Sequence, residues 1–284
     1  MIRWFRETGW RHLIGGLMLL VVMTPLAYIL SAALSEGGTL TGSNELFRSI
    51  SLANFQELLA GERVPYVTWW LNTMKVAAGA TIGSVAVSAM AAYAFSRFRF
   101  RGRRQGLAAI LLIQMFPAVL GLVALFLLLD WIGGIFPGIG LDTHPGLILV
   151  YLGGSLGVVT WLITGNFNTI PRELDEAARI DGAGHVRIFL VVVLPLAAPM
   201  LVVVALLTFM LTVGEFAVAN VVLNDRDVLT AAVGLTDLAT GTDGRNANWG
   251  LFAAGAVLLA APVLVLFFAG QRWIVGGLTS GSVK

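Results

Sequence analysis

The sequence predicts an all-α polytopic membrane protein with six transmembrane helices, and three observations lead to that fold class. Of the 284 residues, 57% are hydrophobic and 12% are charged, whereas about a quarter of the residues in soluble domains are charged. The mean hydropathy is +0.86. Several stretches also supply the roughly 20 mostly apolar residues that a helix needs to cross a bilayer. We therefore expect a multi-pass protein of the cell membrane.

The first predicted span covers residues 13–34, which contain no charged residue and follow three arginines at positions 3, 6 and 11. A cleaved signal peptide is the alternative, because Ala32 and Ala33 are small. Its apolar region would be longer than the roughly 7 to 15 residues typical of signal peptides. We therefore interpret the segment as a retained span, followed by a polar loop over residues 36–68.

The second and third spans are predicted over residues 73–95 and 107–129. Small residues recur at four-residue spacing in the second span, and this pattern favours close helix packing in lipid. The third span contains Gln114 and Pro117, so we expect a kink near the proline.

The last three spans are predicted over residues 146–165, 196–223 and 249–270. The fifth span contains Glu215 and, five residues later, Asn220. An acidic side chain at membrane depth is costly and usually faces a cavity or a partner. A polar loop over residues 224–247 separates the last two spans.

The distribution of basic residues predicts the orientation. With both termini in the cytoplasm, the inside segments hold 13 of the 18 basic residues, as the positive-inside rule requires. Five of them lie between the second and third spans, in a segment without an acidic residue: Arg97, Arg99, Arg101, Arg103 and Arg104. A nucleic-acid-binding patch is the alternative for this cluster, but the positive-inside rule explains it more simply.

The most polar of the inside loops precedes the fifth span. It carries seven charges between Arg172 and Arg187. Pro171 suits the first position of a helix, and acidic residues follow where the helix dipole favours negative charge: Glu173, Asp175 and Glu176. Gly182 is expected to end this helix in a left-handed conformation. The alternative is an ordinary amphipathic surface helix.

The spacing of residues in this loop resembles the EAA loop of ABC importer permeases. Glu176, Ala177 and Ala178 are followed by Gly182 after three intervening residues, and by Val192-x-Leu194-Pro195 after nine more intervening residues. Valine replaces the isoleucine that the family most often has. The resemblance implies a type I ABC importer transmembrane domain with both termini in the cytoplasm, in which Glu176, Ala177, Ala178, Asp181 and Gly182 couple the chain to an ATPase.

Further segments resemble carbohydrate-importer permeases of the MalG type: Ala92–Phe98, Gly214–Phe216 and the ending over residues 271–284. The resemblance implies three regions. Residues 1–69 form the first span and the first outer loop, residues 70–270 form the transmembrane domain with the EAA loop at 166–195, and residues 271–284 form a cytoplasmic tail. In this family the tail lies between ATPase subunits, and here the implied contact residues are Leu278, Thr279 and Gly281.

The assembly implied by the resemblance contains a second, MalF-like permease, two copies of a MalK-like ATPase and an extracytoplasmic sugar-binding protein. The loop over residues 224–247 would reach into the binding protein. The chain would form half of a pathway for maltose, maltodextrin or a related α-glucoside, with Gln114, Glu215 and Asn220 as pathway candidates. A permease for another solute, such as trehalose, another oligosaccharide or glycerol phosphate, is the near alternative. A secondary transporter is the distant one.

We expect no catalytic residue, bound cofactor or metal site in this chain. No glycine-rich loop ends in the Gly-Lys-Ser/Thr of a P-loop. There is no cysteine, and the three histidines lie in different segments, so the spacing typical of zinc sites is missing. ATP and Mg²⁺ would be bound by the partner ATPase, and no nucleic acid is expected as a partner.

Overall fold

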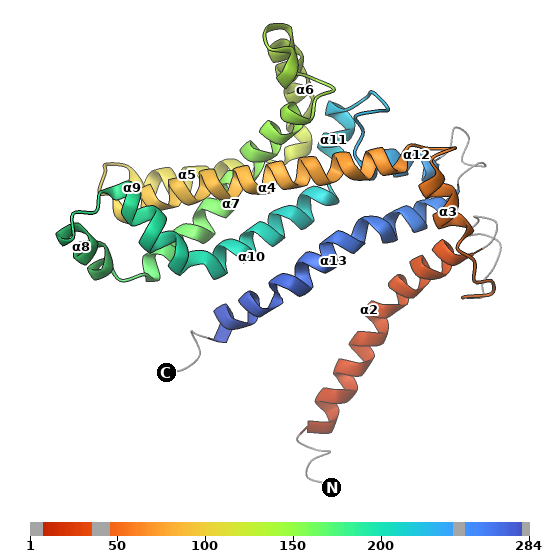
Figure 1. The fold of residues 1–284 in the computed structure, drawn as a ribbon, viewed down its shortest axis with the longest axis horizontal. Coiled ribbons are helices and arrows are strands. Elements are labelled where there is room, and N and C mark those ends of the chain that lie inside the picture. Colours follow the sequence, from red (N-terminus) through yellow and green to blue (C-terminus); the bar gives the residue numbers. More distant parts are fainter. Residues whose placement is uncertain (1–7, 36–45, 241–247, 280–284) are drawn as a thin grey trace. The chain divides into compact units, whose positions relative to one another are not determined.

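The computed structural model describes residues 8–35, 46–240 and 248–279, and no β-strand occurs within these ranges. Five helices are long and apolar enough to cross a membrane: Trp10–Leu34, Tyr66–Arg97, His144–Thr169, His185–Val213 and Trp249–Gln271. The number rises to six if the bent pair Arg103–Gln114 and Val119–Ile135 forms one span. The predicted all-α membrane architecture is confirmed (Figure 1).

The chain divides into two compact units, each described by itself. The first consists of residues 1–67 and 234–261. Helix α2 (Trp10–Leu34) leads to α3 (Ala53–Ala60), and Asn54 of α3 donates hydrogen bonds to the carbonyl oxygens of Ala33 and Ser35, at 3.0 and 2.8 Å. Tyr66 donates to the Gly255 carbonyl at 2.7 Å, which ties the start of α4 to α13 (Trp249–Thr279).

The second unit consists of residues 68–233 and 262–284, and the helices α4 (Tyr66–Arg97), α7 (His144–Thr169) and α10 (Leu194–Val213) run alongside one another in it (Figure 1). A Cβ atom added at Gly79 or Gly83 of α4 would lie 2.7 Å from a side-chain atom of α7. The Ser84 and Ser155 hydroxyls form a hydrogen bond between the two helices. Small residues therefore let α4 approach α7 closely, as the spacing predicts.

The third predicted span is broken rather than kinked. Helix α5 covers Arg103–Gln114 and helix α6 covers Leu122–Ile135, and the chain bends by 81° between them. Pro117 lies at the break with ψ of 116° and has no N–H to continue a helix. The predicted position of the distortion is confirmed, but the distortion is a break between two helices rather than a kink within one helix over residues 107–129.

The fifth predicted span also differs from the structure. It begins as α9 (His185–Ile188), passes through a π-helical turn (Phe189–Val193) and continues as α10. Pro195 cannot donate the backbone hydrogen bond that an α-helix would form to Val191, which explains the wider turn at this place. Helix α10 ends at Val213, and a separate short helix, α11, covers Ala217–Val222. One continuous span over residues 196–223 was therefore wrong.

The predicted polar loop over residues 224–247 contains a helix that was not expected, α12 (Ala231–Thr240). The segment that leads into α12 is held by side chains at the start of α4. Trp69 donates to the Arg226 carbonyl at 2.8 Å, and Asn72 donates to the carbonyls of Asp227 and Leu229 at 2.8 and 3.1 Å. This part of the loop therefore has a defined conformation.

Candidate functional site

The EAA segment, residues 166–195, presents a short helix, α8 (Arg172–Ile180). Pro171 immediately precedes the helix as its N-cap, one position earlier than predicted. Glu173 and Asp175 lie in the first turn, where negative charge favours a helix.

A Schellman motif ends α8. Gly182 has φ of +81° and donates to the Arg179 carbonyl at 2.9 Å, and Ala183 donates to the Ala178 carbonyl at 2.9 Å. These two bonds are the pair that defines the motif. The predicted left-handed glycine is confirmed.

The five residues singled out for ATPase coupling all lie on α8 or its terminal turn. Glu176, Ala177, Asp181 and Gly182 are exposed, and Ala178 is half-buried against the core of the second unit. A large apolar side chain is exposed beside them, since Ile180 is 87% exposed. The helix thus offers a mixed acidic and apolar surface of the kind that protein partners cover.

Asp175 has a different position from the other acidic residues of α8, because it is buried. Its Oδ2 atom lies 2.7 Å from Nε of Arg97, and the two side chains are 4% and 2% exposed. The sequence predicted Asp175 as a partner of the helix dipole and Arg97 as one of five loop arginines. Asp175 does lie in the first turn, but the structure adds a contact that neither prediction included, since the pair joins α8 to the end of α4.

Arg97 also holds the end of α7. Its Nη1 atom donates to the Phe167 carbonyl at 3.1 Å, and its Nη2 atom donates to the Ile170 carbonyl at 3.2 Å. One guanidinium therefore connects α4, the last turn of α7 and α8. Removing one partner from a buried ion pair typically costs about 3–5 kcal/mol, because the other charge remains buried without compensation.

A second group of contacts reinforces this junction. Arg172 of α8 donates to the Ser96 carbonyl at 2.8 Å, and the Ser96 hydroxyl donates to Oδ1 of Asn168 at 2.9 Å. Tyr93 of α4 donates to the His185 carbonyl at 3.3 Å, and its ring lies 5.1 Å from that of Phe189. Both flanks of the exposed α8 turn are thus connected to α4.

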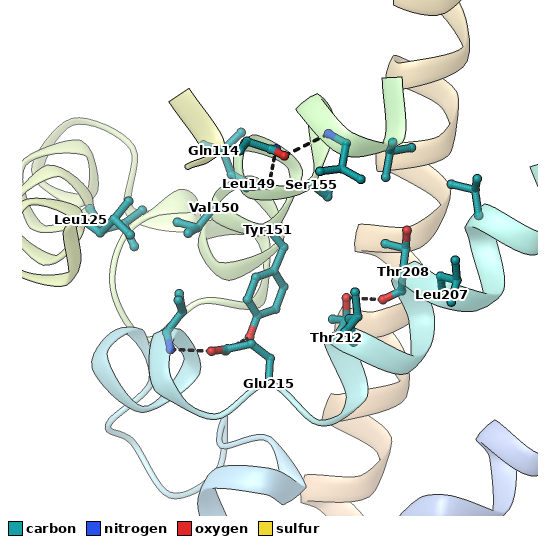
Figure 2. Close-up of a pocket in the computed structure, with 18 of the residues that line it drawn as sticks. Gln114, Leu125, Leu149, Val150, Tyr151, Ser155, Leu207, Thr208, Thr212 and Glu215 are labelled. Atoms are coloured by element: carbon teal, nitrogen blue, oxygen red, sulfur yellow. Dashed lines mark hydrogen bonds between the residues drawn. The ribbon is translucent and has the colours of Figure 1, made fainter. Parts of the chain in front are cut away.

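A cavity of about 780 Å³ lies among α5, α6, α7 and α10, with a few polar side chains in a largely apolar lining (Figure 2). Gln114 and Glu215, two of the three pathway candidates, line it together with Tyr151. Asn220 is exposed on α11 and does not line this cavity. The structure thus brings two of the three candidates to one cavity.

Gln114 is bound to the backbone of α7. Its Nε2 atom donates to the Gly154 carbonyl at 2.6 Å, and its Oε1 atom accepts from the Val158 N–H at 2.9 Å. These two backbone groups are four residues apart, the spacing that an α-helix pairs internally. A Cβ atom at Gly157 would lie 2.6 Å from the Gln114 amide carbon, so the glycine makes room for this side chain.

Glu215 lies in the break between α10 and α11 rather than inside a helix. One carboxylate oxygen, Oε1, accepts from the Val218 N–H at 2.8 Å. The other, Oε2, accepts from the Tyr151 hydroxyl at 2.6 Å and from the Ala219 N–H at 3.0 Å (Figure 2). The carboxylate therefore satisfies the free N–H groups at the start of α11.

The predicted tail residues lie at or beyond the end of α13. This helix continues to Thr279, nine residues past the predicted end of the span at residue 270. Leu278 and Thr279 belong to its last turn, and Gly281 lies outside the described residues.

Across the described ranges, no three His, Asp or Glu side chains cluster in a way that would hold a metal ion. The site consists of the exposed α8 surface, the buried junction beneath it and the cavity.

Comparison with known proteins gives consistent matches. Residues 84–279 match the family described as binding-protein-dependent transport system inner membrane component. The maltose/maltodextrin transport system permease protein MalG of Vibrio parahaemolyticus is 41% identical over 96% of this chain and 94% of its own length. The protein of the same name from Escherichia coli K12 is 40% identical over the same shares.

Solved structures show the same fold. A chain of a bacterial ABC transporter involved in the import of the acidic polysaccharide alginate superposes with a TM-score of 0.79 at 24% identity, over 95% of this chain and 97% of that one. A chain of the MetNI methionine ABC transporter in an inward-facing conformation has a TM-score of 0.56 at 22% identity, over 80% of this chain and 99% of that one.

Proposed function

The chain belongs to the family of binding-protein-dependent transport system inner membrane components, and on that premise we propose that it is one permease of an ATP-driven importer of maltose or maltodextrin. As a permease subunit of an ABC importer it is a multi-pass inner membrane protein without catalytic activity of its own. The observation that carries the proposal is helix α8, whose residues Glu176 and Ala177 are exposed while its Asp175 is anchored to Arg97 of α4.

The coupling role of α8 is supported by its geometry. Its acidic and apolar side chains are exposed while Asp175 beneath them is buried, so the outer surface is free to dock and the inner surface is fixed. We infer that two copies of a MalK-like ATPase, which bind ATP and Mg²⁺, serve the importer and that one of them receives this helix. Glu176, Ala177, Ala178, Asp181 and Gly182 form its contact surface.

The cavity supports a role in the pathway. Gln114 and Glu215 face it, but their hydrogen bonds to α7 and α11 occupy most of their polar atoms. A sugar needs several free polar partners, so this chain supplies a largely apolar wall. We infer that a MalF-like second permease supplies most of the sugar contacts, and that Asn220 faces the pathway away from this cavity.

The loop after α11 supports docking of an extracytoplasmic binding protein. Exposed residues 224–227 are held in place through the hydrogen bonds from Trp69 and Asn72. A surface that is already ordered loses little conformational entropy when a partner binds. We infer that this segment, with the rest of the loop to residue 247, contacts the sugar-binding protein.

The choice of sugar rests on the MalG relatives at 40–41% identity. The same fold occurs in an alginate importer, so the fold alone fits trehalose, another oligosaccharide or glycerol phosphate as well.

The test is uptake by the purified complex in proteoliposomes, with a panel of radiolabelled maltose, maltotriose, trehalose and glycerol phosphate. We expect ATP-dependent uptake of maltose and maltotriose and copurification of an ATPase. ATP-dependent uptake of trehalose or glycerol phosphate without uptake of maltose would show that the proposed cargo is wrong. Uptake by the chain without an ATPase would instead indicate a secondary transporter.

A further inference from the structure

The junction beneath α8 has a consequence for how the importer moves. Five arginines lie between the end of α4 and the first turn of α5, and among them Arg97 alone is buried in the described structure. The other four line an open hollow over residues 99–105. The positive-inside rule accounts for exposed arginines, but it gives no reason to bury one of them against α8.

We propose that Arg97 joins the ATPase-coupling helix α8 rigidly to the ends of α4 and α7, so that these three elements move as one body during transport. The proposal rests on the proposed function, because it concerns how motion of α8 reaches the spans. Arg97 acts through other groups and is therefore a positioning residue.

The contacts of Arg97 reach all three elements from one side chain. Its guanidinium binds Asp175 of α8 and the carbonyls of Phe167 and Ile170 at the end of α7, while its own backbone belongs to the last turn of α4. The planar guanidinium carries several donors in a fixed arrangement. It therefore fixes the direction as well as the distance between α8 and the two spans.

Burial of the pair makes separation of α8 from α4 costly. If α8 slid away from α4, Arg97 and Asp175 would each lose the opposite charge at a buried position, and breaking a buried ion pair in this way is strongly unfavourable. When a partner displaces the exposed surface of α8, moving α8 together with α4 and α7 therefore costs less than separating α8 from α4. The packed core shared by α4, α7 and the start of α10 transmits that movement further.

The weaker part of the junction lies toward α5. Residues 98–102 connect α4 to α5 without helical structure, and Gly102 has φ of +85°. No hydrogen bond from Arg97 to α5 occurs among the described contacts. Arg97 therefore fixes α8 to α4 and α7 directly, whereas α5 is held to α7 through the separate contacts of Gln114.

The test exploits the absence of cysteine from the chain. Arg97→Cys and Asp175→Cys, introduced together, remove the ion pair, and a short bifunctional thiol reagent with a cleavable disulfide can then bridge the two positions. The complex is reconstituted with its ATPase and with the binding protein as purified from the host. The readout is the ratio of ATP hydrolysis with and without binding protein, together with maltose uptake per ATP.

We expect the unbridged double variant to assemble but to lose about tenfold in this ratio, within the range of known coupling free energies. Bridging should restore the ratio, and reduction should abolish it again. Arg101→Cys combined with Asp130→Cys is the matched control, because it also replaces one arginine and one aspartate, both positions are exposed, and neither lies on α8. This control should keep the stimulation ratio within twofold.

Two results would overturn the proposal. One is a normal stimulation ratio in the unbridged double variant. The other is a bridged complex whose maltose uptake is blocked and recovers when the bridge is reduced, because this result would mean that α8 has to move relative to α4 during transport. Failure of the wild-type complex to take up maltose is a separate result. It would contradict the proposed cargo, while the stimulation ratio would still decide the role of Arg97.

Discussion

The Tyr151 hydroxyl donates a 2.6 Å hydrogen bond to Glu215 across the cavity, from the first half of α7 to the break between α10 and α11. The same carboxylate accepts from two backbone N–H groups of α11. Glu215 therefore holds together three elements of the cavity wall. These hydrogen bonds explain why an acidic side chain lies in this apolar region, independently of any role of Glu215 in the pathway.

Removal of this carboxylate is expected to destabilise the protein. Glu215→Ala leaves the Tyr151 hydroxyl and the N–H groups of Val218 and Ala219 without their acceptor, and each unsatisfied buried group costs about 1–3 kcal/mol. Thermal unfolding of the purified protein in detergent should show a lower midpoint. Glu215→Gln retains one oxygen acceptor and should lose less. Asn220→Ala, at an exposed position, is the control, and equal midpoints for Glu215→Ala and Asn220→Ala would contradict this role.

Two glycines of α7 provide a matched test of the Gln114 contact. Gly157→Ala would place a methyl group 2.6 Å from the Gln114 amide, whereas a methyl group at Gly153 would meet nothing within 4 Å. We expect Gly157→Ala to lower stability by about 1–3 kcal/mol through overpacking and to reduce uptake. Gly153→Ala should be neutral or stabilising, since alanine favours a helix. Thermal unfolding and uptake are measured for both variants. Equal unfolding midpoints and equal uptake would contradict the close contact between position 157 and Gln114.

The turn after α8 offers a second matched pair. A Cβ atom would meet nothing within 4 Å at Gly182 or Gly184, but Gly182 has φ of +81° and Gly184 has φ of −75°. Gly182→Ala should therefore cost about 1–2 kcal/mol from backbone strain, with Gly182→Val worse and Gly182→Asn milder. ATPase copurification and uptake should fall in that order, with normal membrane insertion. Gly184→Ala is expected to retain both, and wild-type uptake by Gly182→Val would argue against docking at this turn.

The predicted orientation can be tested by labelling with an impermeant thiol reagent in intact cells. Single cysteines at Arg101, Ala183, Asn224 and Thr240 sample three connections between the spans, with Asn224 and Thr240 both in the connection that precedes the last span. Asn224 is preferred to Thr143, because the Thr143 side chain caps α7 by accepting from the Gly146 N–H. Reagent added outside should label positions 224 and 240 alone. Labelling of position 183 from outside would invert the topology and remove the basis for ATPase docking.

The tail prediction concerns contact with the ATPase. Deletion of residues 277–284 removes Leu278, Thr279 and Gly281, which resemble the tail of MalG-type permeases. We expect normal expression with lower ATP hydrolysis in response to sugar-loaded binding protein, measured in proteoliposomes. A deletion of residues 281–284 alone keeps the last turn of α13 and serves to separate loss of helix from loss of tail. Full stimulation and uptake in both truncations would show that the tail is dispensable.

The local features of this protein were determined by the sequence alone. The long apolar stretches specify membrane helices because each must satisfy its own backbone hydrogen bonds in lipid, and four of the predicted spans lie within single helices. The left-handed Gly182 was predictable because a helix end followed by glycine is resolved within a few residues. The EAA spacing likewise lies within one segment, so the order of its residues was enough to predict a coupling loop there.

The contacts across the fold were decided only by the tertiary structure. A helix in lipid is apolar on most faces, so its periodicity does not show which face packs against another helix. Nothing local distinguishes Arg97 from the neighbouring loop arginines, or Asp175 from Glu173 and Glu176. The burial of the pair depends on how α4 and α8 meet. In the same way, the hydrogen bonds from Gln114 to the backbone of α7 form only because α5 packs against α7. The hydrogen bond from Tyr151 to Glu215 likewise forms only because α7 lies beside the start of α11.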